Sequence, residues 1–434
     1  MQYPRVLIIS HNSLSKTSNN GKTIASLFSR WPRAHIAQIY ICSRDVPDFE
    51  LCNHYYHITD MNVLRGIFNR KQNIGGRILR NAHQLSSAAS NQLSSSAPDG
   101  NLITWIKSKS YWFEFLRDMV WQLGFRRSPD LDEWIKEFSP DAVFFVGGPY
   151  EHSHKLARDI CREYHLPLYV YFTDDYVVNR IDNRPWTWLI YANRRRFYKL
   201  TISAAKACFV IGEYMAAQYG KFYGRSFVPI MNTVPIYEIP EVRKHDKTVI
   251  SFIGGIHLNR WRSLVHIGEI INKIVVKKSI PVELNIYCAQ EIPKKILVRL
   301  NRGCMRFCGK LIGESEVRAA IDASDILLHV ESMDKKSRIL TNMSISTKIP
   351  EYLISGRCVV AYGPHEIASI RLIANNAIGV AITDNDSDEE LEQTLEKVLS
   401  DESLRHEFGL AGHRYCLEHF TIDKVLNRFE SFFD

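Results

Sequence analysis

Ser344–Pro364, SISTKIPEYLISGRCVVAYGP, joins a polar turn, a helix that carries one acid and a buried strand in one short segment. The turn supplies hydroxyl groups and free backbone N–H groups at the helix start, where Ser346 is expected to be the N-cap. Such a helix start favours an anion. Lys348 adds a cation in the first turn, although a helix by itself prefers an acid there. This conflict indicates a phosphate bound at Ser346, Thr347 and Lys348, and an ordinary capped surface helix is the alternative.

The second half of the segment predicts a buried strand. Gly356 is expected to end the helix, and the apolar run CVVAYG that follows is typical of a parallel strand covered on both faces. Glu351 lies one turn inside the helix, close enough to the expected phosphate to accept hydrogen bonds from sugar hydroxyl groups. A solvated surface glutamate is the alternative reading of that acid.

This segment resembles the nucleotide-binding stretch of family 4 glycosyltransferases, which are retaining enzymes of the GT-B fold. The family pattern is a small-residue turn followed by E-A-M-A-x-G-x-P-V-V-A, and residues 351–361 run in that register. The resemblance implies that Glu351 holds the ribose of a nucleotide-sugar donor. The family usually carries a second glutamate eight residues earlier, where this chain has Met343, and Glu331 is out of register.

A second part of the resemblance lies at VISFIGG, residues 249–255, and the turn HLNRWRSL that follows. Family members usually read F-V-G-R here with a lysine a few residues further on, and the two cations clamp the donor pyrophosphate. This chain has Gly255 in place of the first cation and Arg260 in place of the lysine. Arginine suits phosphate because its planar fork binds two oxygens. The resemblance implies that Arg260 binds the donor phosphates, and surface charge is the alternative.

In the first half of the chain, a strand over residues 5–10 leads into the polar loop HNSLSKTSNNGKT. The triplet that begins at Gly21 is not a P-loop, because Lys16 stands where that motif needs a glycine. The resemblance implies that Asn20 and Gly21 face the donor. A plain turn is the alternative.

Candidate catalytic groups follow two predicted strands of the first half, over residues 141–148 and 167–173. Acids at the carboxyl end of a parallel strand lie where such sheets bind ligands. The family often has a His-Asp pair at this place, which here reads Asp174 and Asp175, and His152 follows the earlier strand. These three residues are the catalytic candidates, while a capping role for the acid pair is the alternative.

The region of about 64–130 reads as a helical and low-complexity insertion in the first domain. Residues 86–100, SSAASNQLSSSAPDG, contain almost no large apolar side chain, which predicts a flexible loop. Residues 105–127 are crowded with Trp and Phe and flanked by Lys and Arg, a composition that fits an amphipathic helix in a membrane interface. A helix that covers the domain's own core is the alternative.

Composition bounds the rest of the interpretation. The 434 residues are 45% hydrophobic and carry a formal net charge of +8, which suits a folded protein with anionic ligands. Nine cysteines without repeated spacing favour a reducing compartment and exclude a zinc-finger pattern. The first apolar run is too short for a secretion signal, and no stretch is long enough to span a bilayer. We therefore expect a cytoplasmic protein, at the inner face of the membrane if residues 105–127 bind it.

The predicted fold is α/β, of the GT-B type, with two Rossmann-like domains whose parallel sheets face each other across a cleft. We expect residues 1–225 to form the acceptor domain, 226–246 a linker, 247–412 the nucleotide-sugar domain, and 413–434 a helix that crosses back to the first domain. The acidic run at residues 384–388, DNDSD, reads as a helix cap rather than a metal site, and no cofactor is expected.

The predicted function is retaining transfer of a sugar from a UDP- or GDP-linked donor to a saccharide or polyprenyl-linked saccharide in bacterial envelope polysaccharide synthesis. One alternative is a sugar-nucleotide epimerase, which shares the architecture but needs no second substrate. Another is a non-catalytic partner protein with a decayed site, which Met343 and Gly255 would explain. Nucleic-acid binding is not expected, because no basic stripe with a recognition motif is present.

Overall fold

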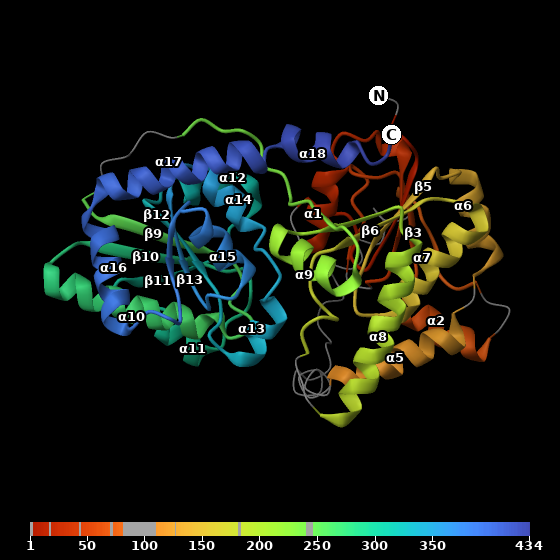
Figure 1. The fold of residues 1–434 in the computed structure, drawn as a ribbon, viewed down its shortest axis with the longest axis horizontal. Coiled ribbons are helices and arrows are strands. Elements are labelled where there is room, and N and C mark those ends of the chain that lie inside the picture. The colour runs from red at the N-terminus through yellow and green to blue at the C-terminus, as the bar shows by residue number, and fades with distance from the viewer. Residues whose placement is uncertain are drawn as a thin grey trace. The chain divides into compact units, whose positions relative to one another are not determined.

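The protein folds into two compact units, each built on its own sheet (Figure 1). This computed structural model describes residues 3–16, 19–42, 45–69, 73–80, 110–125, 127–180, 184–239 and 246–434. Unit 1 comprises the described residues up to Pro229 together with Phe433, and unit 2 comprises those from Ile230 to Phe432 together with Asp434.

Unit 1 contains an eight-stranded sheet in the order β4-β3-β2-β1-β5-β6-β7-β8. Its strands are β1 (Val6–Ser10), β2 (Ile36–Tyr40), β3 (His54–His57), β4 (Gly76–Ile78), β5 (Ala142–Val146), β6 (Leu168–Phe172), β7 (Ala207–Val210) and β8 (Val228–Pro229). All neighbours pair in parallel except β4, which runs antiparallel to β3 at the edge. Every residue of β1, β2, β5 and β6 is buried, because helices cover both faces of a parallel sheet.

The described helices of unit 1 connect these strands in βαβ fashion. They are α1 (Asn19–Leu27), α2 (Asp60–Phe68), α5 (Ser110–Gly124), α6 (Pro129–Phe138), α7 (Glu151–Tyr164), α8 (Pro185–Ala204) and α9 (Glu213–Tyr223), with a short 3-10 helix at Arg33–His35. None of the helices in the described part of the chain is both long enough and apolar enough to cross a membrane.

Unit 2 contains a six-stranded, wholly parallel sheet in the order β11-β10-β9-β12-β13-β14. Its strands are β9 (Thr248–Ile253), β10 (Val282–Tyr287), β11 (Met305–Gly309), β12 (Ile326–Val330), β13 (Cys358–Tyr362) and β14 (Val380–Ile382). Its helices are α10 (Arg260–Lys278), α11 (Lys294–Arg299), α12 (Gly313–Asp322), α13 (Lys335–Thr341), α14 (Lys348–Ile354), α15 (Ala368–Asn375), α16 (Asp388–Ser400), α17 (Glu402–His419) and α18 (Ile422–Glu430).

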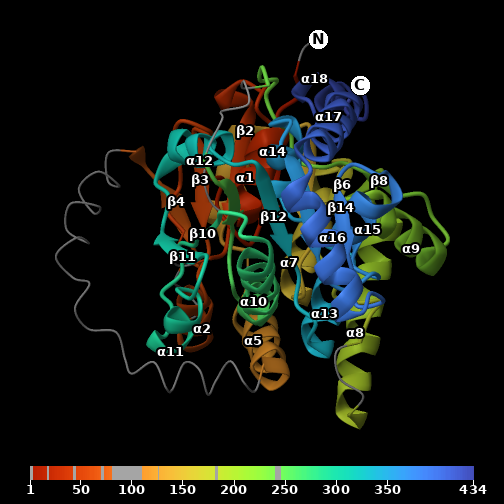
Figure 2. The same cartoon turned by 90° about the vertical axis from the view of Figure 1, so that its left-hand side faces the viewer.

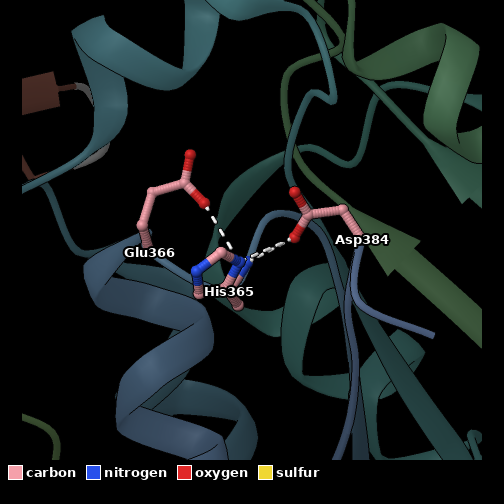
Figure 3. A group of neighbouring side chains, drawn as sticks. All are labelled: His365, Glu366 and Asp384. Carbon is pink, nitrogen blue, oxygen red and sulfur yellow. Dashed lines mark hydrogen bonds and ion pairs between the residues drawn. The ribbon is translucent and has the colours of Figure 1, made fainter.

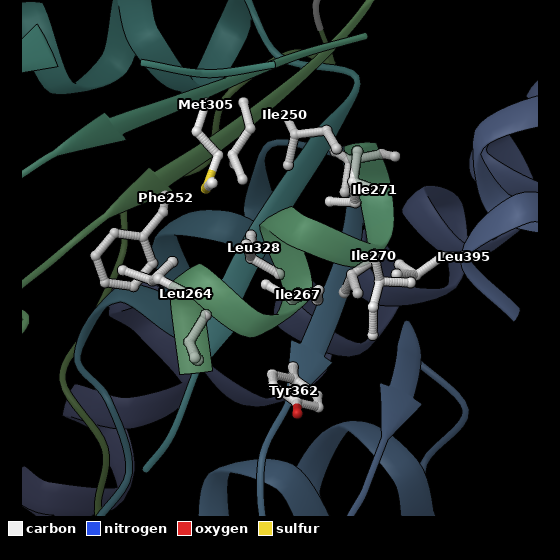
Figure 4. Packing of buried hydrophobic residues seen from close by; sticks show 14 of the residues in the cluster. Ile250, Phe252, Leu264, Ile267, Ile270, Ile271, Met305, Leu328, Tyr362 and Leu395 are labelled. Atoms are coloured by element: carbon white, nitrogen blue, oxygen red, sulfur yellow. The ribbon is translucent and has the colours of Figure 1, made fainter. Parts of the chain in front are cut away.

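The core of unit 2 lies between the sheet and the helices α10 and α16 (Figure 4). Leu264, Ile267 and Ile271 on one face of α10 pack among strand residues such as Leu328, and all are at most 1% exposed. Helix α10 approaches the sheet closely at Gly268, where an added Cβ would lie 2.2 Å from the sulfur of Met305. This close packing holds the middle of α10 against the sheet.

Each sheet has one place where the strand order reverses. In unit 1 this switch point lies between β1 and β5, and in unit 2 it lies between β9 and β12. Doubly wound sheets bind ligands at the carboxyl ends of the strands beside such a reversal, because the crossover helices leave a crevice there. The topology therefore gives each unit its own candidate site.

Several features of the structure bear on the predicted linker and on the predicted C-terminal segment. The predicted linker at 226–246 begins within unit 1, because β8 pairs with β7, and residues 240–245 of it lie outside the described part. Helix α17 runs without a break through residue 413, where a separate segment was expected. Phe433 packs in unit 1, where its ring centroid lies 4.3 Å from that of Tyr169. The predicted low-complexity loop at 86–100 lies outside the described residues. The limits of the two domains stay a prediction.

Candidate functional site

The switch point of unit 2 holds an ion pair between Arg260 and Glu331. Arg260 is the first residue of α10, and the loop that leads to it from β9 passes through left-handed conformations at Leu258 and Asn259. Its Nε donates to Oε2 of Glu331 at 3.1 Å, and its Nη2 donates to Oε1 at 2.8 Å. Glu331 follows β12 directly, and its N–H donates to the carbonyl of Tyr362 at the end of β13. The carboxyl ends of three neighbouring strands thus meet at this pair.

Burial sets the chemistry of the pair. The Glu331 side chain is 3% exposed and that of Arg260 is 18% exposed. Gly363 makes room for the acid, since a Cβ there would lie 2.7 Å from the Glu331 Cβ. Burial raises the pKa of the Glu331 carboxyl, while the Arg260 guanidinium opposes that rise. Nη1 of Arg260 makes no hydrogen bond to the described residues, so the fork presents one unused edge at the switch point.

The opening segment of the sequence lies beside this pair. Helix α14 is fixed by Tyr352, whose hydroxyl accepts from the N–H of Ile253 at 3.0 Å and donates to its carbonyl at 3.2 Å. Ile253 is the last residue of β9, so α14 sits at the carboxyl end of the same strand that leads to Arg260. Nζ of Lys348 lies 2.8 Å from Oε2 of Glu351, and both side chains are partly exposed.

The predicted cap of this helix at Ser346 is present only in a weak form. Thr347, not Ser346, precedes α14, and its side chain makes no capping hydrogen bond. The Ser346 hydroxyl accepts only a long bond of 3.4 Å from the N–H of Lys348. Because Thr347 has helical backbone angles, Ser346 stands where a side chain can accept from the N–H two residues on, although that bond is long.

Sequence reasoning missed Glu331, because it set that acid aside as out of register. Met343, which stands at the family's second glutamate position, is 2% exposed and belongs to the core. The buried acid of this site therefore comes from the end of β12 and not from the turn before α14. A signal was present, since an acid directly after an apolar strand run marks the carboxyl edge of a parallel sheet.

The switch point of unit 1 holds a pocket of about 170 Å³. It is lined by the ends of β1 and β5 and by neighbouring loops: Ser10, His11, Asn12, Asn20, Ile24, Ile41, Val146, Gly147, Gly148, Pro149, Tyr150, Ser153 and Tyr176. None of these side chains is an acid, a lysine or an arginine. Although the His11 ring reaches the surface, desolvation by its surroundings and the nearby Arg117 lower its pKa to about 4. The pocket is therefore neutral at physiological pH.

The two predicted donor residues of unit 1 separate in the structure. Asn20 lines this pocket. Gly21 packs against the preceding loop, where an added Cβ would lie 2.2 Å from the carbonyl oxygen of Ser13. Close backbone approach thus accounts for a glycine at that position, and its donor role stays a prediction.

His152 is oriented by an acid from another helix. Its Nδ1 lies 2.8 Å from Oδ1 of Asp118 on α5, and its ring stacks on Trp121 at a centroid distance of 4.0 Å. Burial lowers the pKa of His152, and Asp118 opposes that shift. Its Nε2 is buried and has no hydrogen-bond partner in the described part of the chain. A neutral imidazole held in this way can accept a proton at Nε2.

Asp175 has the contacts of a turn-forming residue. Its carboxylate accepts hydrogen bonds from the N–H groups of residues 177, 178 and 179 and from the hydroxyl of Tyr219. These bonds match the capping alternative for the acid pair. Asp174 accepts from the hydroxyl of Thr173 at 3.2 Å and lies at the carboxyl end of β6. Catalytic roles for Asp174, Asp175 and His152 stay predictions.

One group of described side chains has the spacing of metal ligands: His365, Glu366 and Asp384 (Figure 3). Asp384 accepts from Nδ1 of His365 at 3.0 Å, and the guanidinium of Arg338 lies 2.7 Å from it. Burial alone would raise the pKa of Asp384, but the His365 hydrogen bonds and Arg338 lower it to about 2. The arginine thus already supplies cationic charge to these acids. The acids of DNDSD were expected to cap the next helix, but the N-cap of α16 is Ser387, and of these acids Asp388 lies in the first turn.

Comparison with solved structures gives the fold. WaaG, a glycosyltransferase involved in lipopolysaccharide biosynthesis, matches with a TM-score of 0.57 at 13% identity over 98% of this chain and 99% of WaaG. TarM of S. aureus, solved with fondaparinux, alpha-GlcNAc-glycerol and UDP, matches with a TM-score of 0.57 at 12% identity over 99% of this chain and 100% of TarM. A trehalose 6-phosphate synthase from Burkholderia multivorans matches with a TM-score of 0.58 at 9% identity, over 99% of this chain and 98% of the synthase.

The chain has the GT-B fold. The prediction of two Rossmann-like α/β domains of this type is confirmed. No family model matches the sequence, and no curated protein is significantly similar to it. Membership of family 4 therefore stays a prediction. Within the GT-B fold, the site of unit 2 carries the cations and the site of unit 1 is neutral.

Proposed function

We propose that this protein is a retaining, family 4-type glycosyltransferase of bacterial envelope polysaccharide synthesis, such as O-antigen, capsule or exopolysaccharide. In this proposal, unit 2 binds a UDP- or GDP-linked sugar, and unit 1 binds a saccharide or polyprenyl-linked saccharide at the inner face of the cytoplasmic membrane. The observation that carries the proposal is the chemical difference between the two switch points. Two cations, each paired with a carboxylate, lie at one, and a neutral pocket lined by hydroxyl and amide groups lies at the other.

The donor site combines groups suited to a diphosphate and a ribose. The unused edge of Arg260 and the ammonium group of Lys348 are available for phosphate oxygens, which favour cationic donors. Ser346 and Thr347 add hydroxyl groups at the same turn. Glu351 is the group that would accept hydrogen bonds from ribose hydroxyls, since its carboxylate is partly exposed beside Lys348.

The main task of the protein in this reaction is to place positive charge beside the departing diphosphate. The acceptor hydroxyl oxygen forms a bond to the anomeric carbon and passes its proton to an oxygen of the departing diphosphate, while the bond from that carbon to the phosphate oxygen breaks. The departing nucleoside diphosphate keeps the bonding electrons, so negative charge grows on its phosphates. Fixed cations at that place stabilise the transition state more than the ground state, which accelerates the step. Arg260 is fixed by Glu331, and α14 is fixed by Tyr352.

The acceptor site is supported by the pocket of unit 1. Its volume of about 170 Å³ is small for a whole oligosaccharide, so it suits the terminal ring of one. Asn12, Asn20 and Ser153 supply hydrogen-bonding groups, and Tyr150 and Tyr176 supply aromatic surface. A neutral, hydroxyl-rich ring fits this lining better than a phosphate does.

Nucleotide affinity tests the donor site. Titration calorimetry with UDP and with GDP should show binding of one of them to the wild type. Lys348→Ala should weaken it about tenfold, which corresponds to about 1.4 kcal/mol for one lost charged contact. Lys336→Ala removes an exposed cation of α13 and serves as the matched control, with unchanged affinity. Equal affinity in Lys348→Ala would exclude the proposed phosphate contact.

A second assay separates transfer from its alternatives. A labelled nucleotide sugar is incubated with the protein in the absence of an acceptor. Slow release of nucleotide supports a transferase, whereas an isomerised donor identifies an epimerase. Failure to bind UDP, GDP or any labelled donor, with the protein folded, would identify a non-catalytic partner protein.

A further inference from the structure

Strand β12 carries one polar residue among apolar ones, close to the switch point of unit 2. Its five residues are Ile326, Leu327, Leu328, His329 and Val330, and all of them are buried. Burying an imidazole costs free energy unless its polar atoms find partners, and a leucine at that position would avoid this cost. The contacts of the histidine must therefore offset the cost of burying it.

His329 and Glu331 point to the same side of the sheet. Side chains alternate along a strand, and Leu328 and Val330 belong to the core beneath α10. His329 and Glu331 therefore point away from that core and toward α15, which packs beside β13 and β14 (Figures 1 and 2). The histidine thus lies next to the acid that pairs with Arg260.

Two contacts of the imidazole link α15 to the buried ion pair. Its Nε2 lies 2.9 Å from the hydroxyl oxygen of Ser369, the second residue of α15, which is 0% exposed. The same nitrogen lies 3.5 Å from Oε1 of Glu331, the oxygen that accepts from Nη2 of Arg260 at 2.8 Å. The contacts thus form one line from α15 through the imidazole and the carboxylate to the guanidinium.

Charge decides which nitrogen of His329 carries the proton. Burial and the nearby guanidinium of Arg260 lower the pKa of His329 to about 3, so the ring is neutral. A lone pair on Nε2 would face the carboxylate of Glu331, so the tautomer with the proton on Nε2 is favoured. The ring therefore attracts the same oxygen that Arg260 binds, and it limits the rotation of the carboxylate.

We propose that His329, held by Ser369, is a positioning residue of the donor site. Its contact with Glu331 fixes the carboxylate, and the fixed carboxylate turns the unused edge of Arg260 toward the donor phosphates. This step rests on the proposed function, because it concerns the same site. A guanidinium that must first turn toward the phosphates stabilises their growing charge less well than one already in place. His329 acts through Glu331 and not on the donor itself.

Unit 1 supplies a matched histidine that faces no acid. His154 on α7 is also buried, and burial lowers its pKa to about 3. Its Nδ1 lies 3.0 Å from the hydroxyl oxygen of Thr201, and its Nε2 lies 3.0 Å from the carbonyl oxygen of Gly148. His154 thus matches His329 in burial and in its hydroxyl contact, and it faces a carbonyl where His329 faces a carboxylate.

Nuclear magnetic resonance of arginine side chains tests the positioning without any ligand. In the full chain with isotope-labelled arginine, the Nε–H of Arg260 should give a sharp signal that exchanges slowly with water, and Arg260→Lys identifies it. His329→Leu should broaden or shift this signal, whereas His329→Gln should keep it, because the glutamine amide can donate to the carboxylate. His154→Leu should leave the signal unchanged while it lowers the stability of unit 1.

A second arm measures the consequence for the donor site. His329→Leu and Ser369→Ala should each weaken binding of UDP, or of GDP if the wild type binds that nucleotide, about threefold or more, because Arg260 is no longer held in place. His329→Gln and His154→Leu should bind it like the wild type. Ser369→Ala removes a single oxygen, so it gives the answer if His329→Leu does not fold.

The proposal is overturned if His329→Leu or, where that variant does not fold, Ser369→Ala leaves both the Arg260 signal and the nucleotide affinity unchanged. It is also overturned if His154→Leu lowers both as much, since either result makes His329 an ordinary core histidine. The resonance arm needs no nucleotide. A wild type that binds neither UDP nor GDP would therefore overturn the proposed function, while the resonance result still decides whether His329 positions Arg260.

Discussion

The two switch points share a topology and differ in charge. In unit 2, a buried carboxylate and an arginine meet between β9 and β12, with a second ion pair on α14. In unit 1, the equivalent place between β1 and β5 is a neutral pocket. The topology decides where a ligand binds, and the side chains that follow each strand decide which ligand it is.

This difference in charge should make unit 2 more sensitive than unit 1 to the loss of a single side chain at its switch point. A neutral pocket loses little when one polar group is removed, because water replaces that group. A buried ion pair loses much, because the remaining charge has no partner. The comparison therefore predicts different responses to matched substitutions in the two units.

The largest effect should follow Arg260→Ala. This change leaves the Glu331 carboxylate buried without its partner and should lower the free energy of unfolding of unit 2 by about 3–5 kcal/mol. Ser153→Ala, at the pocket of unit 1, should cost only about 1 kcal/mol, because its hydroxyl donates one hydrogen bond to the carbonyl of Tyr150. Hydrogen exchange read by mass spectrometry along a urea series measures the two units separately.

A double variant shows whether charge is the reason. Arg260→Met/Glu331→Leu replaces both partners by apolar groups and should recover most of the lost stability. If Arg260→Ala is as stable as the wild type, the ion pair does not distinguish unit 2, and the comparison fails.

Much of this architecture could be predicted from the sequence, because long apolar runs such as residues 142–146 and 358–362 identify buried parallel strands. The short edge strands β4 and β8 were not predicted. Strands of two or three residues are too short to show an alternation of apolar and polar side chains. Helix α13 was also missed, since Lys335–Thr341 has too few turns to show an apolar face.

The site was less accessible to sequence reasoning than the fold. Arg260 was predicted as a phosphate cation, but its partner Glu331 is 71 residues away, and no local pattern links the two. The same holds for His152 and Asp118, which come from different helices. The turn around Asp175 was the easier case, since its bonds reach only two to four residues ahead and the capping alternative follows from local chemistry.

Acid should act on the two units alike, because each buries a neutral histidine behind its switch point. His154 on α7 and His329 on β12 are at most 6% exposed, and burial lowers the pKa of each to about 3. Below pH 6.5 the unfolded chain binds a proton that the folded chain does not, so stability falls as the pH drops from 6.5 towards 3.

The size of that effect can be checked by substitution. Each histidine should remove about 3 kcal/mol between pH 6.5 and pH 4.5, from 1.36 kcal/mol per pH unit of difference. His154→Gln should flatten the pH dependence of unit 1 alone, and His329→Gln that of unit 2 alone, in urea unfolding followed by hydrogen exchange. An unchanged pH slope in both variants would show that other groups cause the acid sensitivity.

The smallest expected difference in stability between the units concerns two tyrosines, each of which makes a hydrogen bond to the backbone at the carboxyl edge of its sheet. The Tyr352 hydroxyl is the acceptor for the Ile253 N–H in unit 2, whereas the Tyr198 hydroxyl donates at 3.1 Å to the Gly148 carbonyl, which also lies 3.0 Å from Nε2 of His154. Tyr352→Phe leaves a buried N–H without a partner and should cost about 2 kcal/mol, whereas Tyr198→Phe should cost about 1 kcal/mol, because the carbonyl keeps its histidine. Equal costs would mean that backbone relaxation satisfies the Ile253 N–H, and α14 would then be held by its apolar contacts instead.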